Sequence, residues 1–213
     1  MKNEQEIREY LINNTIRLIA EGGFEKATTK AITYDGAQTL GLKMNEVYIY
    51  RLFGGKEKLY AKAFERLDEE FVFSLRRCLH DYNSLDGCVK EKMYATFLRV
   101  WQFLLRNEEW CRCYVRYYYS IYFKGKSLEK HNQLFSVIVE AFSTIFRPEA
   151  DVKAIMHSTL TIMLDFAIRV HNGDLENNDE NRPHVFNVLY CTMESYFKDE
   201  IRKEANSMFI GNA

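Results

Sequence analysis

The sequence predicts an all-α fold, in which a small N-terminal domain of short helices is followed by a larger helical domain. The 213 residues include only 2 prolines and 10 glycines, too few breaks for a β protein with many turns. Apolar residues recur three and four positions apart along most of the chain, and no run of alternating residues indicates a strand. Because 47% of the residues are hydrophobic, the chain can bury a core of the size that its length requires. We expect about nine helices.

The first two helices are predicted from apolar spacing and from the residues at their ends. Apolar residues between positions 7 and 19 follow helical spacing, and the glycine pair at 22–23 is expected to end this helix. Thr28 or Thr29 is expected to cap a second helix, because a threonine hydroxyl can accept a hydrogen bond from the backbone of the first turn. This second helix is predicted to run to about residue 40.

The predicted third helix is short, and the fourth is long. Asn45 is a suitable N-cap for a helix over 46–53, and the glycine pair at 54–55 is expected to end that helix. Lys56 then begins a long helix, which reaches about Asp81 with apolar residues at helical intervals.

The remainder of the chain is predicted to form five further helices, separated by short polar breaks. Their expected ranges are 85–105, 108–123, 128–146, 152–170 and 184–205. We therefore divide the chain into a first domain over residues 1–60 and a second domain over residues 61–213.

Composition argues against several classes of protein. The formal net charge is −1, and residues 1–60 carry nine Lys and Arg against eight Asp and Glu, so no strongly basic surface is indicated. The five cysteines have no recurrent spacing, and we expect neither a metal nor a cofactor. The first residues are charged rather than apolar, and no apolar stretch is long enough to span a bilayer. We therefore expect a cytoplasmic protein that does not contact a membrane.

The predicted third helix has two different faces. Its inward face is apolar and contains Ile49, Leu52 and Phe53. Val47 and Arg51 lie on the opposite face, flanked by Tyr48 and Tyr50. In a major groove an arginine can donate two hydrogen bonds to guanine and a valine can contact a thymine methyl group, so this face is suited to reading DNA. The alternative is that the tyrosines pack on a neighbouring helix.

Residues in and around this helix resemble the DNA-binding domain of the TetR family of bacterial transcriptional regulators. The resemblance covers about residues 5–65, and its most specific part is the segment IYRLFGGKE at 49–57. The matching residues are Gly23, Phe24, Thr28, Thr29, Ile32, Asn45, Ile49, Tyr50, Phe53, Gly55, Lys56, Glu57 and Leu59. The chain departs from the family pattern in having additional residues around 34–43 and in having Val47 where a glycine is common.

The resemblance implies that residues 1–60 form a helix-turn-helix domain that binds double-stranded operator DNA. It implies that Thr28 or Thr29, together with Tyr50 and Lys56, binds phosphates and that the exposed face of the third helix reads bases. The residues that we expect to contact DNA are Thr28, Thr29, Asn45, Glu46, Val47, Tyr48, Tyr50, Arg51 and Lys56. Residues 61–213 would then bind an effector and form the dimer.

Fourteen aromatic residues lie between Tyr94 and Phe146. Aromatic rings can line a pocket for a ligand that is flat, lipophilic or cationic, but most of these residues can equally be packing residues of a core. His157 lies on a largely apolar helix, where a buried polar group would need a partner such as a ligand. The candidate ligand-binding residues are Trp101, Trp110, Tyr114, Tyr118, Tyr122, Phe142, His157 and Phe166.

Each of the last two predicted helices has a broad apolar stripe. A single neighbouring helix cannot cover such a stripe, whereas a four-helix bundle formed with a second copy of the chain would bury both stripes. The candidate interface residues are Met156, Met163, Val170, Val185, Leu189, Met193 and Tyr196. A two-fold homodimer also suits a palindromic operator.

We therefore predict a ligand-responsive repressor that binds its operator as a homodimer and is released by a small-molecule effector. An enzyme is not expected, because the sequence shows no nucleophile–base arrangement, no carboxylate pair and no glycine-rich phosphate loop. The alternative is a helical ligand-binding or adaptor protein without sequence-specific DNA binding, which the near-neutral N-terminal region would suit.

Overall fold

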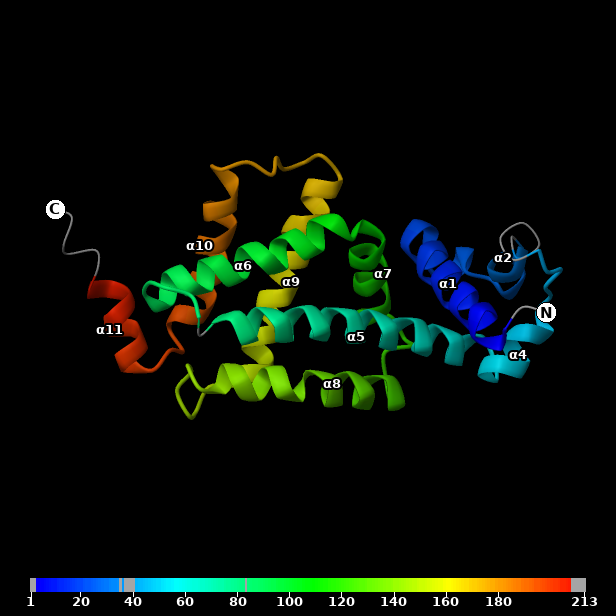
Figure 1. Cartoon of the computed structure of the whole chain (residues 1–213), viewed down its shortest axis with the longest axis horizontal. Coiled ribbons are helices and arrows are strands. Elements are labelled where there is room, and N and C mark those ends of the chain that lie inside the picture. Colours follow the sequence, from blue (N-terminus) through cyan, green and yellow to red (C-terminus); the bar gives the residue numbers. More distant parts are fainter. Residues whose placement is uncertain (1–2, 35, 37–40, 83, 208–213) are drawn as a thin grey trace. The chain divides into compact units, whose positions relative to one another are not determined.

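The computed structural model describes residues 3–34, 36, 41–82 and 84–207, and within these ranges the chain forms ten helices and no strand (Figure 1). An isolated antiparallel bridge joins Phe146 and Phe197. The all-α prediction is therefore confirmed. No helix in the described ranges is both long and apolar enough to cross a membrane.

The chain folds into two compact units, each made of segments that are far apart in the sequence. The first unit consists of Met1–Glu70 and Asn107–Leu134. It contains α1 (Glu4–Lys26), α2 (Thr29–Tyr34), α4 (Val47–Phe53), α7 (Glu108–Tyr118), the first half of α5 (Lys56–Tyr82) and the beginning of α8 (Lys126–Ser143). The predicted boundary at residue 60 separates the expected DNA-binding residues from the expected effector-binding and dimer residues, and this division stays a prediction.

The core of the first unit is formed where α5 and α7 meet. Phe64 of α5 stacks on Tyr117 of α7 with ring centroids 4.3 Å apart, and both side chains are buried. Trp110 donates a hydrogen bond from Nε1 to the Leu67 carbonyl at 3.0 Å, which satisfies the one polar atom of a buried indole. These contacts join a helix of the second half of the chain to the N-terminal helices.

The second unit consists of Phe71–Arg106 and Phe135–Ala213. Its helices are α6 (Val89–Arg106), α9 (Val152–His171), α10 (Asn181–Glu194), α11 (Asp199–Ser207) and the remaining halves of α5 and α8. Trp101 stacks on Phe97 of the same helix and donates to Asn177 Oδ1 at 3.0 Å. Phe186 of α10 packs on Phe97, so aromatic side chains form much of this core.

The prediction of a single helix over 184–205 is wrong, because the chain leaves the helical conformation after Glu194 and begins α11 at Asp199. The intervening backbone pairs with the segment that follows α8. Arg147 donates its backbone N–H to the Tyr196 carbonyl at 2.9 Å, and Lys198 donates its own to the Ile145 carbonyl at 3.1 Å. Backbone hydrogen bonds to a distant segment therefore replace those of a continuous helix.

Other predicted helix ends are shifted. The glycine pair at 22–23 kinks α1 rather than ending it, since Gly23 has φ 75° and ψ −169° but the helix continues to Lys26. The helix expected over 108–123 ends at Tyr118. The second helix was predicted to run to about residue 40, and residues 35 and 37–40 lie outside the described residues.

Candidate nucleic-acid interface

Helix α4 has one buried face and one exposed face, as its sequence predicts. Ile49 and Leu52 are buried against the rest of the first unit. Val47 is 65% exposed and Tyr50 is 59% exposed, which are high values for large apolar side chains. Arg51 is also exposed. A helix with such a face is suited to a partner that binds both apolar and charged groups, as a DNA major groove does.

The beginning of α4 is fixed by Asn45. Its Oδ1 accepts a hydrogen bond from the backbone N–H of Val47 at 3.1 Å, which is the contact expected of a residue that caps the first turn. Glu46 makes no side-chain hydrogen bond of this kind. The helix therefore begins one residue later than predicted, with Glu46 rather than Asn45 at the N-cap position, and the hydrogen bond to Asn45 holds Val47 at the exposed start of the helix.

Arg51 is oriented by a neighbour on the same helix. Its guanidinium carbon lies 4.8 Å from the centroid of the Tyr48 ring, within the range of a cation–π contact. This contact restricts an otherwise mobile side chain while leaving it exposed. An arginine that is ordered in advance loses less conformational entropy when it binds a base.

The end of α4 is held by an arginine of α1 that the sequence did not single out. Arg8 donates a hydrogen bond from one terminal nitrogen to the Leu52 carbonyl at 2.7 Å, and its guanidinium lies 5.3 Å from the centroid of the Phe53 ring. The last carbonyls of a helix have no partner within that helix, so this donor stabilises the end of α4. Because 44 residues separate Arg8 from Leu52, no local pattern indicates the contact.

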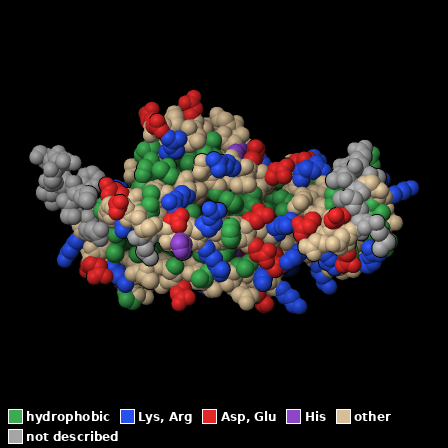
Figure 2. Space-filling model, in the orientation of Figure 1, with side chains coloured by type: hydrophobic (Ala, Val, Ile, Leu, Met, Phe, Trp, Pro, Cys, Tyr) green, Lys and Arg blue, Asp and Glu red, His purple; other side chains and the backbone are tan. Residues whose placement is uncertain are grey.

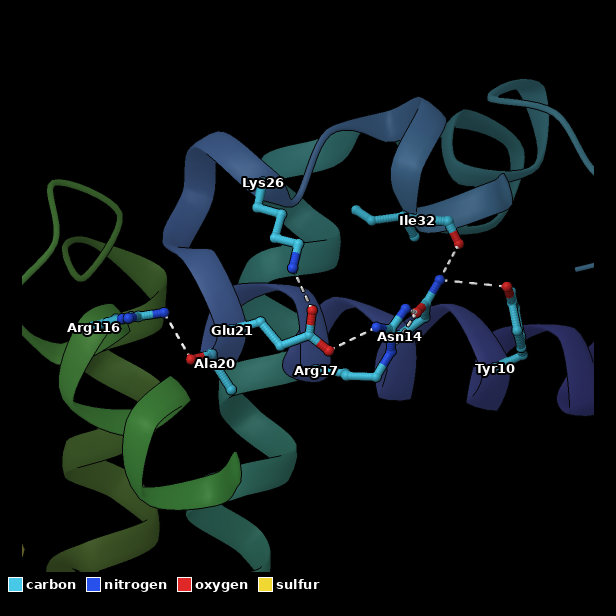
Figure 3. Close-up of polar contacts among 8 residues, drawn as sticks. All are labelled: Tyr10, Asn14, Arg17, Ala20, Glu21, Lys26, Ile32 and Arg116. Atoms are coloured by element: carbon cyan, nitrogen blue, oxygen red, sulfur yellow. Dashed lines mark hydrogen bonds and ion pairs between the residues drawn. The ribbon is translucent and has the colours of Figure 1, made fainter. Parts of the chain in front are cut away.

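Helix α2 is fixed by α1 and α5. The Thr28 hydroxyl accepts from the Ala31 N–H at 3.1 Å, so Thr28 caps α2 as predicted. Asn14 of α1 donates to the buried Ile32 carbonyl at 2.7 Å (Figure 3), and the Tyr60 hydroxyl of α5 donates to the Ala27 carbonyl. Helices α2 and α4 are thus both attached to α1, which sets their relative orientation.

The remaining candidate phosphate-binding residues lie at helix beginnings. Thr29 is the first residue of α2 and is partly exposed. Lys56 is the first residue of α5, and its ammonium nitrogen lies 5.8 Å from the centroid of the Tyr60 ring. Acidic and basic side chains are interspersed on the face shown in Figure 2, in keeping with the near-zero net charge. The geometry of individual contacts, rather than a strong overall field, must therefore determine any DNA affinity.

The structure divides the candidate ligand-binding residues between the two units. Trp110, Tyr114, Tyr118 and Tyr122 belong to the first unit, whereas the second contains Trp101, Phe142, His157 and Phe166. The buried Tyr114 ring packs between those of Phe64 and Trp110, at centroid distances of 5.1 Å and 4.6 Å. His157 is exposed, so the expectation that it is a buried polar group is wrong for this chain on its own.

A polar cluster in the first unit was not found from the sequence. Asp68 of α5 is only 1% exposed, and both of its carboxylate oxygens lie 3.0 Å from Nδ1 of His131 on α8. The Tyr114 hydroxyl, also buried, lies near Asp68 without a hydrogen bond of normal geometry to any described residue. Burial raises the pKa of the Asp68 carboxyl, outweighing the hydrogen bond to His131, and burial raises the pKa of Tyr114 well above its usual value.

Four of the seven candidate interface residues are already buried within one chain, and these are Met163, Val185, Leu189 and Met193. The expectation that a second copy is needed to cover them is therefore wrong. Met156 and Val170 are partly exposed, and Tyr196 is 41% exposed. Only these three side chains of the predicted set retain area for contact with a second copy.

Several solved structures resemble this one over most of their length. A TetR family transcription regulator from Marinobacter aquaeolei is 16% identical, has a TM-score of 0.69, and is matched over 89% of this chain and 96% of that chain. SmeT, the repressor of the Stenotrophomonas maltophilia multidrug efflux pump SmeDEF, is 16% identical with a TM-score of 0.58 over 94% and 95%. RolR in complex with resorcinol is 15% identical with a TM-score of 0.52 over 96% and 95%. No family profile and no curated protein sequence matches this chain.

These likenesses lie in the arrangement of the helices, because so few residues are identical. They extend over both units, and they agree with the resemblance of the N-terminal residues. The chain therefore has the fold of the TetR family of transcription regulators.

Proposed function

We propose that the protein is a ligand-responsive repressor that binds a palindromic operator as a homodimer. The observation that carries this proposal is the exposed face of α4, where Val47, Tyr50 and Arg51 project from a helix whose two ends are held by Asn45 and Arg8. Exposing apolar side chains to water is unfavourable. On a fold shared with transcription regulators, these exposed side chains are best explained as groups that read DNA bases.

On DNA the two kinds of contact would come from different helices. Arg51 would donate two hydrogen bonds to a guanine while Val47 contacts a thymine methyl group and Tyr48 and Tyr50 reach bases or phosphate. Thr28, Thr29 and Lys56, at the beginnings of α2 and α5, would bind phosphates. Residues 1–60 would thus carry the DNA contacts, and residues 61–213 would bind the effector and form the dimer.

Dimerisation through α9 and α10 would supply the two reading helices that a palindrome requires. The partly exposed Met156 and Val170 of α9 and the exposed Tyr196 just after α10 lie on the candidate surface. SmeT is described as the repressor of a multidrug efflux pump, and RolR was solved with the planar aromatic compound resorcinol. Resorcinol supports a flat aromatic effector for this chain, and the aromatic side chains between Tyr94 and Phe146 would suit a flat, lipophilic or cationic molecule.

The proposal is tested by replacing Arg51 in two ways. Arg51→Ala removes the charge and the forked donors, whereas Arg51→Lys keeps the charge and loses only the bidentate geometry. Both variants should lose about 1–3 kcal/mol of specific binding energy per half-site, and Arg51→Lys should retain non-specific binding. Gel shifts with genomic fragments at low salt measure both quantities. If the wild type shows no sequence preference there, a helical ligand-binding or adaptor protein becomes the better description.

A further inference from the structure

Helix α1 contains an internal break, and the carbonyl groups one turn before it accept hydrogen bonds from another helix. The backbone at Gly23 is not helical, with φ 75° and ψ −169°, so the helical path of α1 is interrupted three residues before Lys26. Ile19 and Ala20 precede this break by one turn and are 0% and 3% exposed. Carbonyls at the end of a helical segment need donors from outside that segment.

Arg116 of α7 supplies these donors. One of its terminal nitrogens donates to the Ile19 carbonyl at 2.6 Å and to the Ala20 carbonyl at 2.7 Å, and the Ala20 contact is drawn in Figure 3. Hydrogen bonds from a guanidinium are stronger than those between neutral groups, and a positive charge is favoured at the carbonyl end of a helix. The contact spans 97 residues of sequence and lies within one compact unit.

The helix that Arg116 contacts is the one to which both candidate DNA-binding helices are attached. Arg8 of α1 holds the end of α4, and Asn14 of α1 holds α2 through the Ile32 carbonyl. Beside the break, Glu21 pairs with Lys26 at 2.5 Å, so the turn after Gly23 is also tied to the helix before it (Figure 3). Whatever fixes α1 on α7 therefore fixes the exposed face of α4 as well.

We propose that Arg116 is a positioning residue for DNA recognition, which fixes the broken end of α1 on α7 and thereby sets the orientation of the reading helix. The effect of Arg116 on DNA binding rests on the proposed function, whereas its effect on the position of α1 does not. Arg116 neutralises no phosphate in this role. Helix α7 also carries Trp110, Tyr114 and Tyr118, so Arg116 joins the helix of these candidate effector residues to the helix that holds α4.

The test compares Arg116→Ala with Arg112→Ala, which removes the same charge from the same helix. Arg112 lies one turn earlier and pairs with Glu108 at 2.8 Å within α7, so its loss breaks that ion pair while the donors from Arg116 to the Ile19 and Ala20 carbonyls remain. Hydrogen exchange followed by mass spectrometry, on the full chain without DNA, should show about tenfold faster exchange for amides 20–27 in Arg116→Ala only. Exchange across α9 and α10 should stay unchanged, which general destabilisation would not allow.

DNA binding supplies a second readout. Arg116→Ala should bind the selected operator about tenfold more weakly while the salt dependence of binding stays that of the wild type, because no phosphate contact is lost. The operator affinity of Arg116→Lys should fall between those of the wild type and Arg116→Ala, since a lysine ammonium can still donate to either carbonyl. If circular dichroism shows that Arg116→Ala does not fold, hydrogen exchange and operator affinity are both measured on Arg116→Lys instead.

The outcomes separate this inference from the proposed function. Equal exchange at 20–27 in the Arg116 and Arg112 variants would overturn the positioning role, as would unchanged operator affinity in Arg116→Ala. Locally faster exchange in a protein whose wild type selects no DNA would support the attachment of α1 by Arg116 and contradict the proposed function alone.

Discussion

Asp68 is a carboxyl group whose surroundings disfavour its charge. It lies almost fully buried on α5, with His131 of α8 as its hydrogen-bond partner, and the His131 ring in turn contacts the rings of Phe64 and Tyr118. Burial is the largest effect on the pKa of Asp68 and raises it. His131 and the nearby Tyr114 hydroxyl lower this pKa by less, and Glu65 raises it slightly. The neutral form of Asp68 is therefore favoured in the folded protein relative to the unfolded chain.

This asymmetry predicts a pH dependence of stability. A carboxyl group with a raised pKa in the folded state binds more protons when folded, so its contribution to stability is full below its unfolded pKa and is lost as pH rises through the folded pKa. In Asp68→Asn this loss of stability is absent, because an amide does not ionise. The free energy of unfolding of the wild type, relative to Asp68→Asn, should therefore fall as pH rises from acid toward neutral. Urea titrations at several pH values measure the difference, with the exposed Glu129→Gln as control. A difference that rises with pH would contradict the assignment.

Arg8 gives a second prediction for a single residue. Arg8→Ala leaves the Leu52 carbonyl without its donor and removes the guanidinium from the Phe53 ring, so it should destabilise the protein by about 1–3 kcal/mol. Glu4→Gln, which breaks only the exposed ion pair with Arg8, should cost less than about 1 kcal/mol. Chemical denaturation distinguishes the two, and equal effects would mean that Arg8 acts through its surface ion pair.

Among the elements, those defined by local signals could be predicted from the sequence. The two faces of α4, the hydrogen bond that Asn45 accepts from the first residue of α4, and the cap of α2 at Thr28 follow from residues a few positions apart, and the structure has them. The break between α10 and α11 could not be predicted, because its cause is backbone pairing with residues 145–147. The contacts of Arg8, Asp68 and Arg116 each join residues more than forty positions apart, and spacing carries no information about them.

The two helices expected to form the dimer offer a comparison of buried and exposed positions. Met163→Glu places an unpaired charge in the core of the second unit, so it should destabilise each chain by about 3–5 kcal/mol. Met156→Glu, on the partly exposed side of α9, should instead leave the helical content intact and yield monomers. Circular dichroism and light scattering measure the two effects. A stable wild-type monomer at micromolar concentration would contradict the dimer.

For the whole molecule, the near balance of charges limits how DNA can be bound. With a formal net charge of −1, the chain has little long-range attraction for a polyanion, so a few placed cations must supply the phosphate contacts. Lys56, at the beginning of α5, is the clearest of these candidates.

Lys56→Ala should weaken specific and non-specific DNA binding about equally. Loss of one phosphate contact should reduce the slope of log K against log salt by about one unit per half-site. Fluorescence anisotropy over a series of salt concentrations measures the slope, and Lys62→Ala, whose ammonium pairs with Glu65 one turn further along α5, is the matched control. A changed base preference with an unaltered slope would show that Lys56 reads bases instead.

We propose above that two copies of this chain read a DNA sequence through α4. It is tested most directly by selecting the DNA that the wild-type protein binds from a random pool at low salt, with Arg51→Ala selected in parallel. We expect the wild type to enrich an inverted repeat whose half-sites are about one helical turn apart or a multiple of it, and Arg51→Ala not to enrich it. Base reading by α4 would be ruled out if the wild type enriched no common sequence or if Arg51→Ala enriched the same repeat.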